Sequence, residues 1–174
     1  MAQSFVPGPS TERSFRDALG CFSSGVTVVT TMTADGPVGM TANSFSSVSL
    51  APPLILWSAA KAPRRYRAFF AAERFAVHVL ARNQQQFARN FATAGDAFEQ
   101  AEWAPNDDGV PILAERLALF DCKTSARYDA GDHTIIVGQV LLAEHGSGAG
   151  LIFEQGEYGH FTPFKVAKPT LNSA

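Results

Sequence analysis

Residues 39–58 read GMTANSFSSVSLAPPLILWS, and the fold prediction starts from this stretch. Its first half is rich in Ser, Thr and Asn, whose side chains compete with the backbone for hydrogen bonds and weaken regular structure. Its second half follows Pro52-Pro53 with an apolar run that is typical of a strand buried on both faces. Hydroxyl donors beside a buried strand indicate a site for a polar ligand, such as a phosphate.

Size and charge exclude several classes of protein. The chain has 174 residues, the usual size of one domain with its own core. Its 14 basic and 16 acidic residues give a net charge of −2, so no overall field favours nucleic acid as a partner. Apolar runs such as Leu54–Trp57 fall far short of the roughly 20 residues that a membrane helix needs. We therefore expect neither a membrane nor a nucleic-acid partner.

The N-terminus and the cysteines bear on localisation. Residues 1–10 lack the basic-then-apolar pattern of a signal peptide. Cys21 and Cys122 each stand alone, without a C-x-x-C partner. Such isolated cysteines favour a reducing compartment and argue against a disulfide. We expect a cytoplasmic protein.

Three segments have the apolar spacing of helices, and several others have the β-branched or alternating pattern of strands. Asp35-Gly36 predicts a hairpin turn, and residues 129–132 predict the turn of a second, longer hairpin. The predicted helices run from Ser10 or Thr11 to Gly25, from Ala62 to Ala72 with Pro63 in the first turn, and from the N-cap Asn83 to Thr93. The predicted strands are 26–31, 38–45, 54–57, 75–80, 117–128, 134–144, 151–153 and 157–161, with loops over 95–111.

Hairpins dominate this order of elements, and no alternation of strands and helices is visible. The pattern therefore predicts a mainly β fold, an antiparallel barrel with about three peripheral helices. We expect a flexible N-terminal segment over residues 1–9, one domain over 10–164, and a flexible tail over 165–174.

Two polar groups of residues are candidates for ligand binding. The hydroxyls of residues 41–49 could donate to phosphate or carbonyl oxygens, although an ordinary polar turn would look similar and strand alternation sends only half of them to one face. Cations at the start of a helix oppose its dipole unless an anion binds there, so a basic cluster at the 62–72 helix suits a phosphate. A solvated basic face is the alternative. The cluster comprises Lys61, Arg64, Arg65 and Arg67.

His133 follows the predicted 129–132 turn and can project from a strand end into a cleft. A lone histidine is more often a satisfied polar residue than a catalytic one. The other histidines are scattered, without the spacing of metal ligands, and no nucleophile elbow is present. Gly146–Gly150 lacks the spacing of a nucleotide-binding glycine loop. An enzyme with this sequence would rely on a cofactor for its chemistry.

The order and spacing of several blocks resemble the short flavin reductase family, the reductase components of two-component flavin-dependent monooxygenases. The resemblance spans most of the chain. It is carried by FRDAL (15–19) with Phe22, GVTVVT (25–30), residues 39–53, FAVHVL (75–80), GVPIL (109–113) and GDHTIIVG (131–138).

The resemblance implies a six-stranded Greek-key split barrel of the FMN-binding type, which binds FMN or FAD, takes hydride from NADH or NADPH, and forms a homodimer with the flavin near the interface. His133 would lie beside the nicotinamide. Two positions depart from the family pattern: Arg64 replaces a small hydroxyl residue, and Ala97 replaces a basic one. The implied flavin contacts are Thr41, Ala42, Asn43 and Ser44 for the ring and ribityl chain, Ser47, Val48 and Ser49 along the next turn, Ser58, Lys61 and Arg64 toward the phosphate, and Phe91 near the ring.

The predicted function is thus an NAD(P)H:flavin oxidoreductase that supplies reduced flavin to a partner monooxygenase. Two alternatives stay open. The flavin could remain bound and pass electrons to a corrinoid or ferric complex, or the domain could bind flavin without catalysis.

Overall fold

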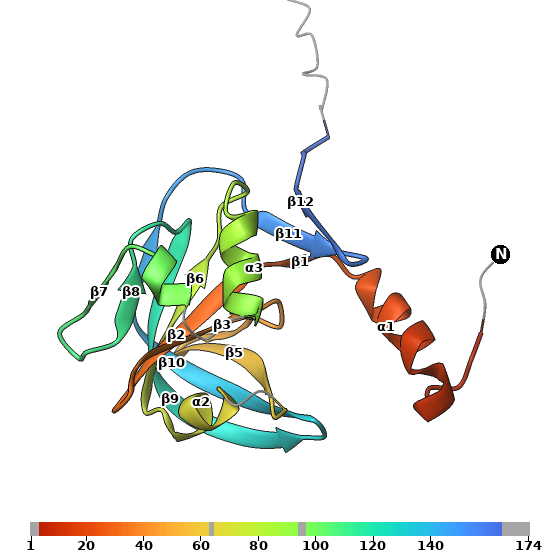
Figure 1. The fold of residues 1–174 in the computed structure, drawn as a ribbon, viewed down its shortest axis with the longest axis horizontal. Helices are drawn as coiled ribbons and strands as arrows, with labels where there is room; N and C mark the ends of the chain where they lie inside the picture. The colour runs from red at the N-terminus through yellow and green to blue at the C-terminus, as the bar shows by residue number, and fades with distance from the viewer. Residues whose placement is uncertain (1–3, 63–64, 94–96, 165–174) are drawn as a thin grey trace, which may run out of the picture.

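The computed structural model describes residues 4–62, 65–93 and 97–164. Its main element is a seven-stranded antiparallel sheet in the order β3-β2-β6-β9-β10-β5-β4 (Figure 1). The strands of this sheet are β2 (Thr27–Thr33), β3 (Gly36–Ala42), β4 (Ser46–Leu50), β5 (Pro53–Ala60), β6 (Arg74–Val79), β9 (Ala118–Ala130) and β10 (His133–His145).

The sheet is rolled around a single core. Met40 of β3 and Ile55 and Trp57 of β5 lie near opposite ends of the strand order, yet they belong to one cluster of buried side chains. Helix α2 (Tyr66–Ala71) adds Phe69, whose ring meets the edge of Trp57 with centroids 5.1 Å apart. Rolling lets the two end strands share a hydrophobic core that a flat sheet could not offer them.

A second core lies between the barrel and helix α3 (Gln85–Thr93). Phe91 of α3 is fully buried and meets Phe98 of the 3-10 helix η2 (Ala97–Gln100) edge to face, with centroids 5.1 Å apart. Gly39 makes this contact possible, because a Cβ at that position would overlap the Phe91 ring. Strand β3 therefore needs a glycine where α3 packs on it.

Smaller elements complete the molecule. Strand β1 (Ser24–Gly25) pairs with β11 (Leu151–Glu154), which pairs with β12 (Glu157–His160). Strands β7 (Trp103–Pro105) and β8 (Pro111–Leu113) form a separate hairpin. Within the described ranges, no helix is long and apolar enough to cross a membrane.

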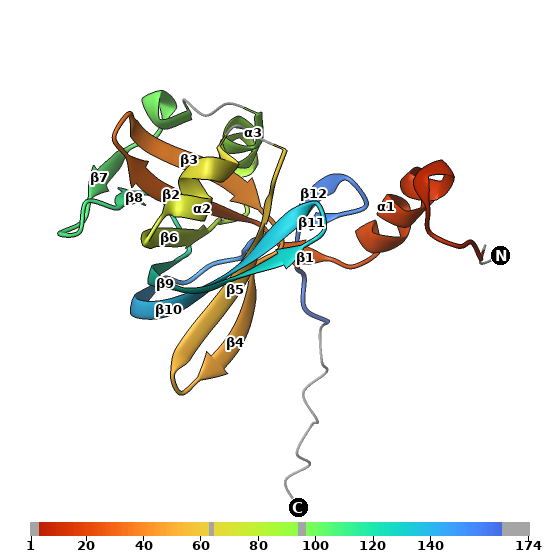
Figure 2. The same cartoon turned by 90° about the horizontal axis from the view of Figure 1, so that it is seen from below.

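Helix α1 (Glu12–Gly20), preceded by the 3-10 turn η1 (Pro9–Thr11), stands away from the barrel (Figures 1 and 2). None of its residues is buried. Phe15, Leu19 and the following Phe22 are 43%, 58% and 81% exposed. The amphipathic spacing predicted this helix correctly, but within the described residues its apolar face is left largely exposed.

The predicted mainly β, antiparallel fold with three α-helices is confirmed, with corrections. The main sheet has seven strands rather than six, because residues 46–50 form β4. The predicted strand 38–45 ends at Ala42, because β3 stops there and a short link leads into β4. The run after Pro52-Pro53 is fully buried on one face only, since Leu54 and Leu56 are half-buried.

Other boundaries also differ from the predictions. The first helix ends at Gly20 rather than Gly25, α2 begins at Tyr66, and α3 begins two residues after the expected cap Asn83. Gln84, not Asn83, makes the side-chain contact at this end, where its Oε1 accepts from the Ala81 N–H at 2.7 Å. The long hairpin turns through two residues, 131–132, instead of four. Pro63, residues 1–3 and the tail 165–174 lie outside the described residues, and the domain limits stay a prediction.

Candidate functional site

The hydroxyl-rich segment links the end of β3 to the start of β4. Thr41 and Ala42 are the last residues of β3, and Thr41 Oγ1 donates to the Ala88 carbonyl of α3 at 2.6 Å. Asn43 is exposed, and Ser44 is half-buried. The Ser44 hydroxyl accepts from the Ser58 N–H at 2.9 Å and lies 3.2 Å from the Ser58 carbonyl, to which it can donate. Ser44 and Ser58 therefore fix the segment against β5.

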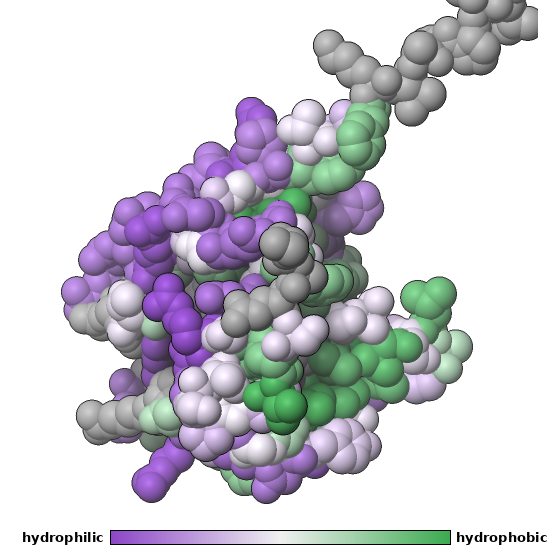
Figure 3. Space-filling model, turned by 90° about the vertical axis from the view of Figure 1, so that its right-hand side faces the viewer, coloured by the Kyte–Doolittle hydropathy of each residue, from purple (hydrophilic) through white to green (hydrophobic). Residues whose placement is uncertain are grey.

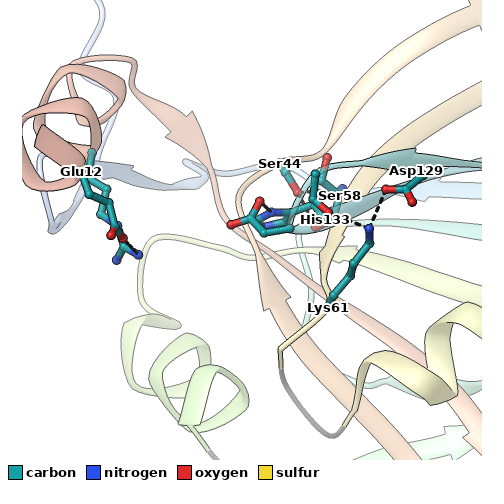
Figure 4. Close-up of polar contacts among 9 residues, drawn as sticks. Glu12, Ser44, Ser58, Lys61, Asp129 and His133 are labelled. Carbon is teal, nitrogen blue, oxygen red and sulfur yellow. Dashed lines mark hydrogen bonds and ion pairs between the residues drawn. The ribbon is translucent and has the colours of Figure 1, made fainter. Parts of the chain in front are cut away.

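Ser58 and His133 lie on the same face of neighbouring strands. Strand β10 pairs with β5 so that His133 lies opposite Ala60, and Ile135 lies opposite Ser58. Paired residues in a sheet share a face, and so do residues two apart along a strand. The other face carries the buried core residues Trp57 and Ile136. The candidate site is thus on the half-buried outer face of the barrel (Figure 4).

His133 is the first residue of β10, and its side chain is 41% exposed. Its Nδ1 lies 2.7 Å from Oδ1 of Asp132. The hydrogen bond from His133 holds the pKa of the Asp132 carboxyl below its ordinary value, so this carboxylate is ionised at neutral pH. An ionised partner leaves the hydrogen on Nδ1, and Nε2 of a neutral ring is then a free acceptor.

Lys61 contacts the same turn (Figure 4). Its Nζ donates to Asp129 Oδ1 at 2.6 Å and to the Gly131 carbonyl at 2.6 Å. Its backbone N–H donates to the Asp132 carbonyl at 2.9 Å. The sequence placed Lys61 at a phosphate, whereas in the structure its ammonium group is bonded to the β9–β10 turn.

A cavity of about 1030 Å³ opens beside Lys61. Arg65 and Arg67 also line it, and Asp35 is the one carboxylate among its lining residues. Such a wall attracts anions. Arg64 lies outside the described residues, so its predicted role stays a prediction.

Arg65 also joins β3 to α3. Its Nη1 donates to the carbonyls of Gly39 and Phe91 at 2.8 and 2.7 Å, and its Nη2 donates to the Ala92 carbonyl at 2.9 Å. Burial lowers the pKa of Arg65, but a guanidinium stays charged at neutral pH. Of the described cations in this cluster, Lys61 and Arg65 are thus bonded within the fold, and Arg67 is exposed.

Ser47, Val48 and Ser49 lie on the edge strand β4, away from His133. Ser49 pairs with Leu54, four residues along β5 from Ser58, a separation of roughly 13 Å. The register shifts between Ser47 and Ser49, and Val48 is 49% exposed. The structure therefore does not bring these three residues together with Ser58 and His133.

Phe91 requires a correction. It is 0% exposed and packs against Phe87 and Phe98, so no ligand can contact it without rearrangement of the core. Its regular spacing with Phe87 on α3 was the mark of a core residue.

Sequence reasoning also missed residues at this site. Asp132 orients His133, and its place directly before the histidine was a usable signal. A small cavity of about 170 Å³ beside Thr41 and Asn43 is walled by Phe153 and Tyr158 from the β11–β12 hairpin, which no local pattern connects to residue 43. Within the described residues, no three His, Cys, Asp or Glu side chains gather as metal ligands would.

A sequence comparison identifies the family. The profile of the Flavin reductase like domain matches residues 19–162. FMN reductase (NADH) SmoA of Agrobacterium fabrum is 53% identical over 158 residues, which cover 91% of each chain. The reductase component of the flavin-dependent trigonelline monooxygenase of Acinetobacter baylyi is 44% identical over 92% of this chain, which spans 52% of that longer relative.

Solved structures agree with the sequence comparison. The NADH:FAD oxidoreductase SgcE6 of Streptomyces globisporus, in complex with NAD and FAD fragments, superimposes with a TM-score of 0.85 at 36% identity over 94% of this chain and 100% of that chain. The flavin reductase PheA2 superimposes with a TM-score of 0.79 at 32% identity over 87% of this chain and 99% of that one.

Proposed function

Since the chain belongs to the Flavin reductase like domain family, we propose that it is an NADH-dependent reductase of FMN or FAD. One observation carries the proposal: the fold brings Ser44, Ser58 and His133 together on a half-buried outer face beside a cation-lined cavity. Ser44 comes from the link between β3 and β4, Ser58 from β5 and His133 from β10.

The residues present fit a flavin and a nicotinamide nucleotide. The basic cavity of about 1030 Å³ is at the upper end of the volumes that bind small molecules, roughly 300–1000 Å³. Arg67 and Arg65 put positive charge on the wall of this cavity, which would attract the phosphates of a nucleotide. Lys61 also lines this cavity, but its Nζ is already bonded to the β9–β10 turn.

The β3–β4 link would hold the ring system. Residues 43–45 lie between two strands, and within the described residues the structure shows no backbone hydrogen bond from their N–H groups. Such N–H groups can donate to ring carbonyl oxygens, where they stabilise negative charge that develops during reduction. The Ser44–Ser58 bonds hold these donors in place.

His133 would contact the nicotinamide. Asp132 orients the imidazole through Nδ1, so that Nε2 is presented to a ligand. When bound, the two nucleotides supply the hydride donor and acceptor, and the side chains on this face bind and align them. No residue has to transfer a proton for this step, which agrees with the lack of a dedicated acid or base.

We propose a homodimer as the working form. The outer face of β5 and β10 carries Leu54, Leu56, Ile135 and Val137, all half-buried, although outer faces of antiparallel sheets are usually polar. Further apolar side chains are exposed on β4 and β10, namely Val48, Leu50, Leu141 and Leu142 at 49%, 96%, 50% and 49%. Figure 3 shows apolar residues gathered on the side of the molecule from which α1 projects.

Helix α1 supports the same proposal. A nine-residue helix with no buried side chain is marginal in water and needs a surface to pack on. A second copy of the chain offers this surface, and it would also cover the outer face that holds the candidate site. Sedimentation should therefore give twice the monomer mass, and Leu19→Lys should shift the protein toward the monomer.

Reduced flavin would then supply a monooxygenase, as the name of the Acinetobacter baylyi relative says of that protein. The decisive experiment is anaerobic titration of the purified protein with FMN, FAD, NADH and NADPH, followed by steady-state NADH oxidation with added flavin. Turnover above the uncatalysed rate with free flavin supports the proposal. Turnover only with a ferric or corrinoid acceptor, or bound flavin that NADH does not bleach, would contradict it.

A further inference from the structure

Lys61 does not behave as a side chain reserved for a phosphate or as a solvated surface lysine, because its ammonium group is bonded to the protein. It follows directly on β5, whose pairing with β10 ends at Ala60 and His133. Beyond that pair, three hydrogen bonds of Lys61 join this end of β5 to residues 129–132: one runs from its backbone N–H to the Asp132 carbonyl and two run from Nζ.

The turn needs such a restraint. Gly131 has φ +67°, in the left-handed region, and both the turn residues 131–132 and residues 129–130 at the end of β9 are exposed. Exposed hairpin tips open more readily than the strands that they join. Each Nζ contact is 2.6 Å long, and together they use two of the three donors of the ammonium group.

His133 directly follows the restrained residues. Its imidazole is oriented by Asp132, whose own side chain is 93% exposed and gains no support from packing. The position of the Asp132–His133 pair therefore depends on the backbone of the turn, and Lys61 holds that backbone at Gly131 and at Asp132.

We infer that Lys61 is a positioning residue for His133, acting through the β9–β10 turn, and is not a ligand of the flavin phosphate. This inference rests on the proposed reductase function. Lys61 fixes the turn from the β5 side, Asp132 fixes the ring, and a shift of about 1 Å at His133 would be enough to slow hydride transfer substantially.

The test compares FMN with riboflavin, which has the same ring but no phosphate. Steady-state NADH oxidation is measured for wild type, Lys61→Met, Arg67→Met and Lys123→Met. Lys123 is exposed on β9, outside the site, and controls for the loss of a surface cation. Lys61→Met should lower kcat about tenfold with both flavins while KM for flavin changes by no more than about twofold. Arg67→Met should raise KM for FMN and leave riboflavin unaffected.

Two further measurements sharpen the test. Asp129→Asn keeps the bond from Lys61 to the Gly131 carbonyl, so kcat should fall only about threefold. Amide hydrogen exchange at residues 131–133 should be about tenfold faster in Lys61→Met than in Lys123→Met.

The outcomes separate the inference from the function on which it rests. A loss in Lys61→Met that appears with FMN alone would make Lys61 a phosphate ligand and overturn the inference. Unchanged exchange at residues 131–133 would overturn it as well. If the wild type showed no turnover with FMN and none with riboflavin, the proposed reductase function would be overturned instead.

Discussion

Two histidines of this chain lie in opposite surroundings. His78 on β6 is 0% exposed; its Nδ1 lies 3.0 Å from the Val28 carbonyl, and its Nε2 accepts from the Leu113 N–H at 3.2 Å. His133 on β10 is partly exposed and has one partner among the described residues, the carboxylate of Asp132. The local sequence predicts that both histidines lie on strands. Only His133 has a ring nitrogen without a partner among the described residues.

The same contrast extends to the regions around them. At the packed end of the molecule, both ring nitrogens of His78 have backbone partners, and Gly39 lies so close to the Phe91 ring that a Cβ would not fit. At the candidate site, the N–H groups of residues 43–45 and the second ring nitrogen of His133 have no hydrogen-bond partner among the described residues. Free hydrogen-bonding capacity, rather than residue type, therefore distinguishes the candidate site from the packed end of the molecule.

His133→Ala should produce the largest effect on activity. Loss of the nicotinamide contact should lower kcat/KM for NADH about 100-fold, the loss that a misaligned reactant can cause, while flavin affinity stays close to wild type. Stopped-flow reduction and flavin titration measure the two quantities. His145→Ala, an exposed change on the same strand, is the matched control, and equal losses of NADH response and flavin affinity would contradict the role of His133.

Gly39→Ala should damage the packed end. Its new Cβ would overlap the Phe91 ring, and overpacking of a core typically costs about 1–3 kcal/mol in the free energy of unfolding. Urea titration measures the loss. Gly159→Ala is the control, because a Cβ there meets nothing within 4 Å. A stability equal to that of the control would show that α3 can move away from β3.

His78 should make stability sensitive to acid. Burial lowers the pKa of His78 to about 3, so the folded state keeps this ring neutral while the unfolded state protonates it. The folded pKa lies below the unfolded one, so stability falls as pH drops below about 6.5, by at most about 1.4 kcal/mol per pH unit.

Proton NMR separates this residue from the others. The ring signals of His78 should not shift between pH 8 and pH 5, the range in which a histidine of the unfolded chain titrates. A midpoint for His78 near 6.5 would mean that its surroundings are open to water.

Thr41→Val should give the smallest effect. It removes the hydrogen bond to the Ala88 carbonyl, at a cost of about 1 kcal/mol in unfolding free energy. Because the hydroxyl is directed to α3, flavin affinity should stay within about twofold of wild type. Ser46→Ala, on the edge strand, is the control for stability. A marked loss of flavin affinity in Thr41→Val would show that the Thr41 hydroxyl contacts the flavin.

Much of the fold could be predicted because hairpins leave local signals. The first hairpin turns at residues 34–35, one position before the predicted Asp35-Gly36, and the second turns at residues 131–132. Each turn lies at or directly before a glycine with positive φ, and alternation marks β9 and β10 on either side of the second turn. Strand β4 was missed because its three serines resemble a turn and only its pairing with β5 makes it a strand. The exposure of the apolar face of α1 could not be predicted for a similar reason. Amphipathic spacing predicts a helix but does not show which surface covers its apolar face.

The candidate site was predicted in part. Ser44, Ser58 and His133 were named from the sequence, and the fold brings them together. Thr41, Lys61 and Phe91 were assigned to a ligand, whereas their side chains contact α3, the β9–β10 turn and the core. Residue type shows which hydrogen bonds and contacts a side chain can make. Whether that side chain can still bind a ligand depends on the carbonyls and rings that the fold places beside it.

The sequence by itself determined the family, the antiparallel hairpins and the chemistry available at residues 41–49, since these depend on residue types and spacing along the chain. Only the tertiary structure decided which hydroxyls are bonded within the fold, which cations stabilise it, and which histidine is exposed. Those outcomes depend on contacts between residues distant in sequence, such as Lys61 with Gly131 or Gly39 with Phe91, and on the burial that sets the cost of each polar group.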